Sequence, residues 1–495
     1  MSRPNILLTF TDQQRADTIG ADGNPLIKTP HLDRLAAEGA MFRSNYTTSP
    51  VCVSARCSLI TGQYPHRNGC FNNGYPMPED RPSMMDLLAD AGYRTHGIGK
   101  MHFTPDPHAL RGFQSREQQA EIVGRVENDD YLQFLHENGF EHVHDPFGQR
   151  SEMYYVPQPS QLPARLHGTN WVGDRAVEFL RQADDDRPFF LWASFIHPHP
   201  PFSPPTPWNK LYRAPLVPPP HVPQQPQQWH TWWNRSQNRA KYRDRGIDLN
   251  LVRCMKAYYW ACVSFIDFQV GRMLEALEER GMLDNTLVIH TSDHGEMLGD
   301  YDCFGKRTML DPAARVPAIA RLPGRFEGGR VVDRTPTSLV DVMPTVLAAA
   351  EVRAPAGQLD GVDLTEVLKG RHKDRTVFAQ IEKDTHGLHM ACDRNWKYFY
   401  SAADEREFLV DRRGDPDETR NRAGLCFCRE ATGRMRSRLI ERYRADGYTE
   451  ALEGDGWRSF ARAPFPEGIP DARLLVQDPG WAEPYKEIPG YTDRE

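Results

Sequence analysis

Apolar runs of strand length that alternate with helical segments restrict the fold of this chain more than any other feature. Residues 5–11 form a strand-length, largely apolar run that leads into the polar residues D-Q-Q, which is typical of a buried parallel strand. A helix followed by a strand is predicted twice more, at 172–183 and 188–195 and at 251–280 and 286–291. Such alternation favours an α/β fold in which a large, mostly parallel sheet is sandwiched by helices.

Local signals place the ends of two further helices. Residues 31–38 carry apolar residues at helical spacing and are followed by Gly39, while Ser83 with Asp86 resembles a capping box that opens a helix. A strand is expected to follow this second helix at 93–99. In a sheet of this kind, chemistry is expected at the carboxyl ends of the strands.

The pattern changes after Gly370 to short strands and one charged helix. The strands are predicted at 377–381, 396–400 and 408–411, and the helix at 433–446, before a Pro-rich tail. We therefore predict two domains. Residues 1–370 would form a catalytic α/β domain, and residues 371–495 a smaller C-terminal α+β domain with an antiparallel sheet.

The composition excludes several classes of partner. The chain has 495 residues, with 60 Lys and Arg against 67 Asp and Glu and a net charge of −7. This charge is spread along the chain, so it offers no basic surface of the kind that nucleic-acid binding requires. Because the mean hydropathy is −0.64 and no apolar run approaches about 20 residues, no membrane-spanning helix is expected. We therefore expect small solutes as partners, with no nucleic acid and no membrane.

Neither the N-terminus nor the cysteines indicate a secreted, disulfide-bonded protein. The first residues, M-S-R-P-N-I-L-L, lack the successive basic, apolar and small-residue stretches of a signal peptide. We expect a cytoplasmic protein, or a periplasmic or secreted one if a leader has been removed. The nine cysteines are an odd number without repeated metal-type pairs, so we expect free thiols, one of which can have a special role.

A proline-rich segment interrupts the alternation. Twelve prolines lie between Pro198 and Pro226, followed by Trp229, Trp232 and Trp233. This composition excludes a central strand or a core helix and predicts a long surface loop. The loop could be a lid or a binding loop whose aromatic rings stack on a sugar or a neighbouring subunit, or the rings could pack on their own chain.

Four polar clusters stand where an α/β sheet places its site, after predicted strands or at the start of a predicted helix. They are Asp12 with Gln13, Cys52 to Arg56, Lys100 with His102, and Asp293 with His294. Each pair alone also fits a helix cap or a solvated turn, but four clusters in this order favour one common site. Their oxygen-rich side chains with one imidazole suit Ca²⁺, Mg²⁺ or Mn²⁺.

The segment S-P-V-C-V-S-A-R-C-S-L-I-T-G-Q at 49–63 resembles the signature of the formylglycine-dependent sulfatases, in which the cysteine of C-x-P-S-R is oxidised to an aldehyde. Other family segments follow in the same order. They are P-N-I-L-L-T-F-T-D-Q-Q at 4–14, T-P-H-L-D-R-L-A-A-E-G at 29–39, G-K-M-H-F at 99–103, H-P-H-P-P-F at 197–202, T-S-D-H-G-E-M-L-G-D at 291–300, G-K at 305–306, A-R-V-P at 314–317 and F-L-V-D-R-R-G-D-P-D-E-T-R-N at 408–421. The resemblance runs from residue 4 to about 425 and implies an alkaline phosphatase-like fold.

The resemblance implies one divalent cation. Ca²⁺ is the expected ion, with Mn²⁺ and Mg²⁺ as alternatives, and the implied ligands are Asp12, Gln13, Asp293 and His294. Many relatives have a second Asp where this chain has Gln13. The D-Q pair resembles the branch that includes choline sulfatases and phosphonate monoester hydrolases.

The resemblance also implies that a formylglycine-generating enzyme converts Cys52 to formylglycine. The hydrated aldehyde would attack sulfur with one hydroxyl to form a covalent sulfated residue, and its second hydroxyl would expel sulfate. Arg56 would hold the modified residue. The motif has Ser54 and Ala55 where the modifying enzyme most often meets Pro and Ser.

The remaining implied roles concern the substrate. Lys100 and Lys306 would hold sulfate oxygens. His102 would help to deprotonate the remaining hydroxyl, and His199, with Lys306, would assist the leaving alcohol.

Three functions compete at this stage. The leading one is hydrolysis of a sulfate monoester, either a sulfated carbohydrate or a small alkyl or aryl sulfate. A phosphonate monoester or phosphodiester hydrolase would use the same residues. The third is a non-catalytic sulfate or sugar binder in which Cys52 stays a thiol, and assembly into a homo-oligomer is left open.

Overall fold

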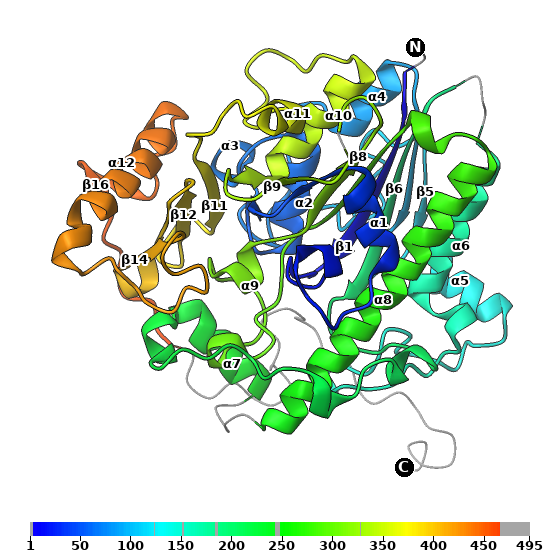
Figure 1. The fold of residues 1–495 in the computed structure, drawn as a ribbon, viewed down its shortest axis with the longest axis horizontal. Coiled ribbons are helices and arrows are strands. Elements are labelled where there is room, and N and C mark those ends of the chain that lie inside the picture. Colours follow the sequence, from blue (N-terminus) through cyan, green and yellow to red (C-terminus); the bar gives the residue numbers. More distant parts are fainter. Residues whose placement is uncertain are drawn as a thin grey trace.

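A computed structural model describes residues 3–122, 124–150, 153–183, 187–242, 248–326 and 328–465. At its centre is an eight-stranded sheet (Figure 1). In chain order its strands are β1 (Asn5–Asp12), β2 (Ala40–Phe42), β4 (Arg94–Gly99), β5 (Ser115–Gln118), β6 (Phe189–Pro198), β7 (Thr286–Ser292), β8 (Ala318–Arg321) and β9 (Arg330–Val332). Their spatial order is β5-β4-β6-β1-β7-β8-β2-β9.

The sheet is mostly parallel, as predicted. The four strands β5, β4, β6 and β1 are parallel to their neighbours, and β1 is parallel to β7 as well. Only β8 runs antiparallel to both of its neighbours, β7 and β2. The carboxyl ends of β4, β6, β1 and β7 therefore lie along one edge of the sheet.

Helices cover both faces of this sheet. One hydrophobic core lies under α1 (Pro30–Glu38), α5 (Asp130–Glu137), α6 (Gly168–Arg181) and α8 (Leu249–Glu279). The other core lies under α2 (Cys52–Thr61), α4 (Met84–Asp90), α10 (Val342–Ala350) and α11 (Leu364–Leu368). Leu7 of β1 belongs to the first core and Leu8 to the second, because successive side chains of a strand point to opposite faces. This explains why β1 is apolar at consecutive positions.

A second, antiparallel sheet follows in the C-terminal part, in the order β11-β12-β13-β14. Its strands are β11 (Val377–Ile381), β12 (Leu388–Cys392), β13 (Trp396–Ser401) and β14 (Arg406–Asp411), and the helix α12 (Arg429–Ala445) packs on one face. This confirms the expected C-terminal α+β unit, and Figure 1 shows it beside the large sheet. The boundary at residue 370 stays a prediction, and the Pro-rich tail from 466 on lies outside the described residues.

Short elements complete the described chain. They are α3 (Pro65–Asn68), α7 (Trp232–Tyr242), α9 (Asp311–Ala314), the paired β3 (Asn45–Tyr46) and β10 (Thr337–Ser338), and the paired β15 (Leu452–Glu453) and β16 (Gly456–Trp457).

The tryptophans after the proline-rich segment pack on their own chain. Trp229 is 1% exposed and stacks near Phe399 and Phe408 of the antiparallel sheet. The indole N–H of Trp233 donates a hydrogen bond of 2.9 Å to the carbonyl oxygen of His386. Of the alternatives for these rings, the structure supports packing within the chain. The segment ends where α7 begins, at Trp232.

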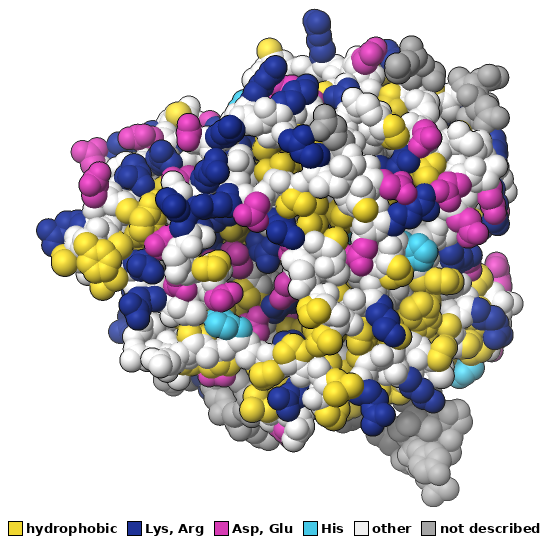
Figure 2. All heavy atoms as spheres, in the orientation of Figure 1, with side chains coloured by type: hydrophobic (Ala, Val, Ile, Leu, Met, Phe, Trp, Pro, Cys, Tyr) yellow, Lys and Arg dark blue, Asp and Glu magenta, His cyan; other side chains and the backbone are white. Residues whose placement is uncertain are grey.

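Among the described residues, no helix is both long and apolar enough to cross a membrane. Figure 2 shows one face of the molecule, on which basic and acidic side chains are intermingled.

Candidate active site

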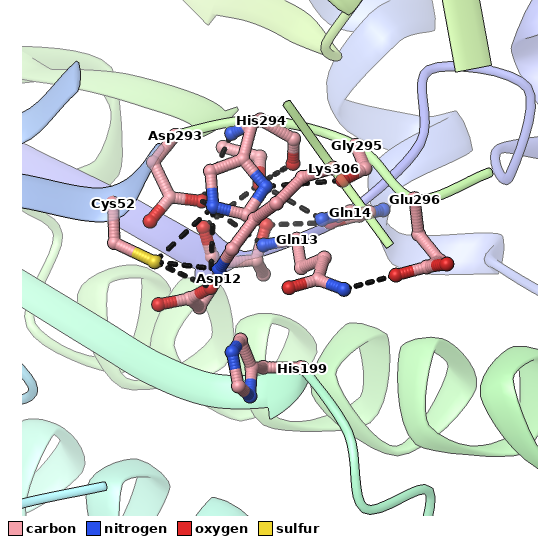
Figure 3. A network of polar contacts seen from close by, with 12 residues as sticks. Asp12, Gln13, Gln14, Cys52, His199, Asp293, His294, Gly295, Glu296 and Lys306 are labelled. Atoms are coloured by element: carbon pink, nitrogen blue, oxygen red, sulfur yellow. Dashed lines mark hydrogen bonds and ion pairs between the residues drawn. The ribbon is translucent and has the colours of Figure 1, made fainter. Parts of the chain in front are cut away.

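Most of the polar side chains predicted at strand ends meet at one place, and Figure 3 shows Asp12, Asp293 and His294 there. Asp12 is the last residue of β1, Lys100 follows β4, His199 follows β6, and Asp293 with His294 follows β7. Because these strands are parallel neighbours, their carboxyl ends deliver the five side chains to the same edge. All five side chains are buried.

Cys52, the first residue of α2, lies at the centre of this group. Its Sγ is 2.8 Å from Nζ of Lys306, 3.2 Å from Nε2 of His294 and 3.7 Å from Oδ1 of Asp12. Burial and Asp12 raise the pKa of the Cys52 thiol, but Lys306, Lys100 and His294 outweigh them and lower it well below its usual range. The site therefore favours negative charge at the position of Sγ.

Arg56 lies one helical turn after Cys52, so both side chains are on the same face of α2. Its Nε donates to Asp293 at 3.0 Å and its Nη2 to Asp12 at 3.3 Å. Its Nη1 donates to Ser194 Oγ at 3.0 Å. Arg56 thus binds both Asp12, at the end of β1, and Asp293, after β7.

A group of ligand atoms here could hold a metal ion. Asp12, Cys52, Asp293 and His294 each offer one atom, and these atoms all lie within 4.8 Å of one another. Burial and Asp12 raise the pKa of Asp293. Burial opposes ionisation of Asp12 as well, but Lys100 and His199 outweigh it, and the pKa of Asp12 is well below its usual value.

The surroundings of Gln13 provide a second observation, beside the spacing of the ligand atoms, that favours a cation site. Its Nε2 donates to Glu296, and its buried Oε1 has no hydrogen-bond partner within the described ranges. Its backbone is left-handed, with φ of 72°, a conformation that non-glycine residues rarely adopt. A buried oxygen without a donor is costly unless a ligand satisfies it. The carboxylate and amide oxygens with one imidazole therefore fit a hard divalent cation.

Two lysines from different loops, Lys100 after β4 and Lys306 after β7, lie beside these ligand atoms. Nζ of Lys100 is 2.5 Å from Oδ2 of Asp12 and also contacts Glu121. Burial disfavours its charge, but Asp12 and Glu121 outweigh burial and raise the pKa of Lys100. Lys306 is held through its backbone, since its N–H donates to Gln237 of α7 at 3.1 Å and its carbonyl accepts from the same amide.

The two predicted histidines differ in their surroundings. His199 approaches Pro200 O with Nδ1 at 2.7 Å and lies 3.3 Å from Glu121 with Nε2, and burial lowers its pKa to about 3. His102 lines a cavity of about 270 Å³ together with Lys100 and Glu121, and its Nδ1 is buried without a partner. In the described part of the chain, no hydrogen bond joins His102 to Cys52. Its predicted role stays a prediction.

Comparison with known proteins decides the family. A profile of the sulfatase family matches residues 4–352, which is more than half of the chain. This chain belongs to the sulfatase family. A second profile, described as N-sulphoglucosamine sulphohydrolase, C-terminal, matches residues 299–445. The expected fold class and the assignment as a sulfatase enzyme are thereby confirmed.

Named relatives cover nearly all of this sulfatase. It is 31% identical to an arylsulfatase of Clostridium perfringens, over 90% of this chain and 96% of the relative. It is also 31% identical to a choline-sulfatase of Rhizobium meliloti, over 85% and 82% of the two chains. Among solved structures, a phosphonate monoester hydrolase from Silicibacter pomeroyi superposes with a TM-score of 0.76 at 25% identity, over 93% of this chain and 100% of the other.

Several side chains at the sulfatase site had not been predicted. Glu121 contacts Lys100 and His199, and Arg150 lies 3.1 Å from the same carboxylate. Glu296 orients Gln13, and Gln237 holds the backbone of Lys306. Only Glu296 stands inside a motif that the sequence displays, T-S-D-H-G-E. The others come from loops and from α7, where no local pattern marks them.

Proposed function

We propose that this sulfatase-family enzyme hydrolyses a sulfate monoester of a carbohydrate or of a small alkyl or aryl alcohol, with Cys52 converted to formylglycine. The observation that carries this proposal is the convergence of Lys306, His294 and Asp12 on one buried Sγ. A hydrated aldehyde at that position would supply an oxygen nucleophile among donors that favour negative charge.

A divalent cation, with Ca²⁺ as our first choice, belongs to this proposal. The residues that would hold it are Asp12, Gln13, Asp293 and His294, and Arg56 would keep the two carboxylates in place. Such an ion would neutralise charge on the ester oxygens. The free Oε1 of Gln13 and the spacing of the ligand atoms support this assignment.

The side chains around Cys52 supply the remaining functions. Lys100 and Lys306 would bind oxygens of the sulfate, because their ammonium groups reach the site from two sides. His199 would assist the leaving alcohol from Nε2, the nitrogen that faces the site while Nδ1 contacts Pro200. Donation needs the protonated ring. Glu121 opposes the effect of burial on the pKa of His199, and a bound anionic ester would favour the protonated ring in the same way. His102 would accept a proton from the remaining hydroxyl of the modified Cys52.

A peptide mass tests the modification directly. Protein from its native host should yield a peptide around Cys52 with the mass of the aldehyde, which is lower than that of the thiol. A peptide that carries only the thiol, in protein that also lacks esterase activity, would support the alternative of a non-catalytic sulfate or sugar binder.

Matched substrates separate sulfate ester hydrolysis from the second candidate. The structural similarity to a phosphonate monoester hydrolase favours keeping this candidate. A sulfate monoester, a phosphonate monoester and a phosphodiester with one common leaving group should be compared by kcat/KM. We expect the sulfate ester to be preferred, and preference for either phosphorus ester would reverse the assignment.

A further inference from the structure

Arg307 is a buried cation that the sulfatase chemistry does not use. This residue is 2% exposed, and its buried Nε and Nη1 have no hydrogen-bond partner in the described part of the chain. Among the described residues, no carboxylate lies within ion-pair distance of its guanidinium. Arg56, which is also buried, and Arg375, which is partly buried, each hold aspartate oxygens.

Such an arrangement destabilises the fold. A buried charge without a partner costs several kcal/mol, which is why buried arginines are normally paired. The backbone of Arg307 is also left-handed, with φ of 60°. Groups kept in this state in a folded protein are typical of ligand-binding sites.

The position of Arg307 points to the substrate. It follows Lys306, and its own N–H donates to Pro50 O at 3.2 Å, two residues before Cys52. Its guanidinium carbon lies 5.4 Å from the ring centroid of Trp233 on α7. Burial lowers the pKa of Arg307, and the charges of Cys52 and Glu382 oppose this effect.

We infer that Arg307 binds a second anionic group of the substrate, a carboxylate or a further sulfate on the alcohol part. This inference rests on the proposed function. The reacting anion already has Lys100, Lys306 and His199 as donors, so an additional buried cation beside them calls for an additional anion. When a guanidinium lies over the face of Trp233, the N–H groups at its edge stay available to an anion. These N–H groups lie in one plane and can donate two parallel hydrogen bonds to carboxylate or sulfate oxygens.

Binding of sulfonates, which have no ester to cleave, tests the inference without turnover. Benzene-1,3-disulfonate and benzenesulfonate should be compared by calorimetry on the wild-type protein and on Arg307→Gln. We expect the wild type to bind the disulfonate about 10- to 100-fold more tightly and the variant to lose this preference, because hydrogen bonds to charged groups are the stronger class. Equal preference in both proteins would overturn the inference.

Thermal unfolding distinguishes a binding residue from a structural one. Without ligand, Arg307→Gln should have a Tm equal to or higher than the wild type, since it removes an unpaired buried charge. Arg375 is the matched control, because its guanidinium pairs with both oxygens of buried Asp341 at 2.8 Å. Arg375→Gln should lower the Tm. A similar loss in Arg307→Gln would show a structural role and contradict the inference.

Turnover of a matched pair separates this inference from the proposed function. The pair is an aryl sulfate that bears a carboxylate and its carboxamide analogue, with the same leaving oxygen. Arg307→Gln should lower the ratio of kcat/KM for carboxylate over carboxamide by about 10- to 100-fold, mainly through KM. An unchanged ratio would refute the inference alone. If the wild type cleaves neither ester yet prefers the disulfonate, and Arg307→Gln loses this preference, the proposed function fails while Arg307 is still shown to bind an anion.

Discussion

Two clusters of buried and partly buried charged side chains in this sulfatase differ in how completely their polar atoms are paired. The first surrounds Cys52. The second lies where the antiparallel sheet meets α9, and consists of Lys397, Asp311 and Glu418. Nζ of Lys397, which is 0% exposed, is 2.6 Å from Asp311 and contacts Glu418, and Glu418 in turn accepts from the backbone N–H of Asp311 at 2.8 Å.

The difference indicates which cluster is built for a ligand. None of the side-chain nitrogen and oxygen atoms of Lys397, Asp311 and Glu418 is among the described buried atoms that lack a partner. Around Cys52, by contrast, Gln13 and Arg307 keep buried atoms unpaired. A fully paired cluster is complete without a ligand, whereas unpaired atoms mark places that a ligand would fill.

The largest effect is expected from Cys52→Ala, which removes the centre of the first cluster. Turnover should fall by on the order of 10⁴-fold or more, because the proposed nucleophile is lost. The Tm should stay close to that of the wild type. Cys57→Ala, five residues further along α2 and also buried, is the matched control and should stay active. Near wild-type turnover in Cys52→Ala would place the nucleophile elsewhere.

Lys397→Met breaks the second cluster. It leaves partly buried Asp311 and buried Glu418 without their shared cation, so the free energy of unfolding should fall by about 3–5 kcal/mol. Denaturant unfolding measures the loss. At a temperature where the variant is folded, its kcat should resemble that of the wild type. A large fall in kcat with unchanged stability would mean that this cluster serves the reaction.

His199→Ala tests whether the cluster around Cys52 assists departure of the alcohol, because its effect on kcat/KM should depend on the leaving group. The loss in kcat/KM should reach about 100-fold for alcohols that leave poorly and should be smaller for nitrophenol, which leaves without a proton. A series of aryl sulfates gives the slope of rate against leaving-group pKa, and the slope should steepen in the variant. The same loss across the series would contradict a role as proton donor.

Gln13→Ala should have the smallest effect. Removing one neutral ligand should weaken the affinity for the activating cation by about 10- to 100-fold. After chelation, the Ca²⁺ concentration that restores half of the thermal stabilisation by the ion should rise accordingly. Lys397→Met serves as the control, since its Ca²⁺ dependence should match the wild type. An unchanged titration for Gln13→Ala would remove Gln13 from the ligand set.

Much of the fold could be predicted because its signals are local. The apolar run at 5–11 became β1, and Ser83 with Asp86 forms the predicted capping box. β11 was predicted with its exact bounds. β12 was missed, because L-H-M-A-C contains no β-branched residue and no Phe, Tyr or Trp, whereas V-F-A-Q-I of β11, which is equally short and buried, contains three such strand-favouring residues.

The site could be predicted only in part, for a related physical reason. Parallel strands bring residues that follow them to one edge, so Asp12, Lys100 and Asp293 could be grouped from sequence. Glu121, Arg150 and Arg307 reach the same place from loops. Their contacts depend on long-range packing that no local pattern encodes, and for Arg307 the decisive property is the absence of a partner, which only a structure reveals.

Helix α7 connects Lys306 at the active site to the antiparallel sheet of the C-terminal part. Gln237 of α7 clasps the backbone of Lys306, while the backbone N–H of Trp232 and the guanidinium of Arg235, on the same helix, both bind Asp404 after β13 at 2.7 and 2.8 Å. The loop after β13 of the antiparallel sheet thus helps to position Lys306 through α7. Loss of the contacts between α7 and Asp404 should therefore shift Lys306 relative to Cys52 while the large sheet stays folded.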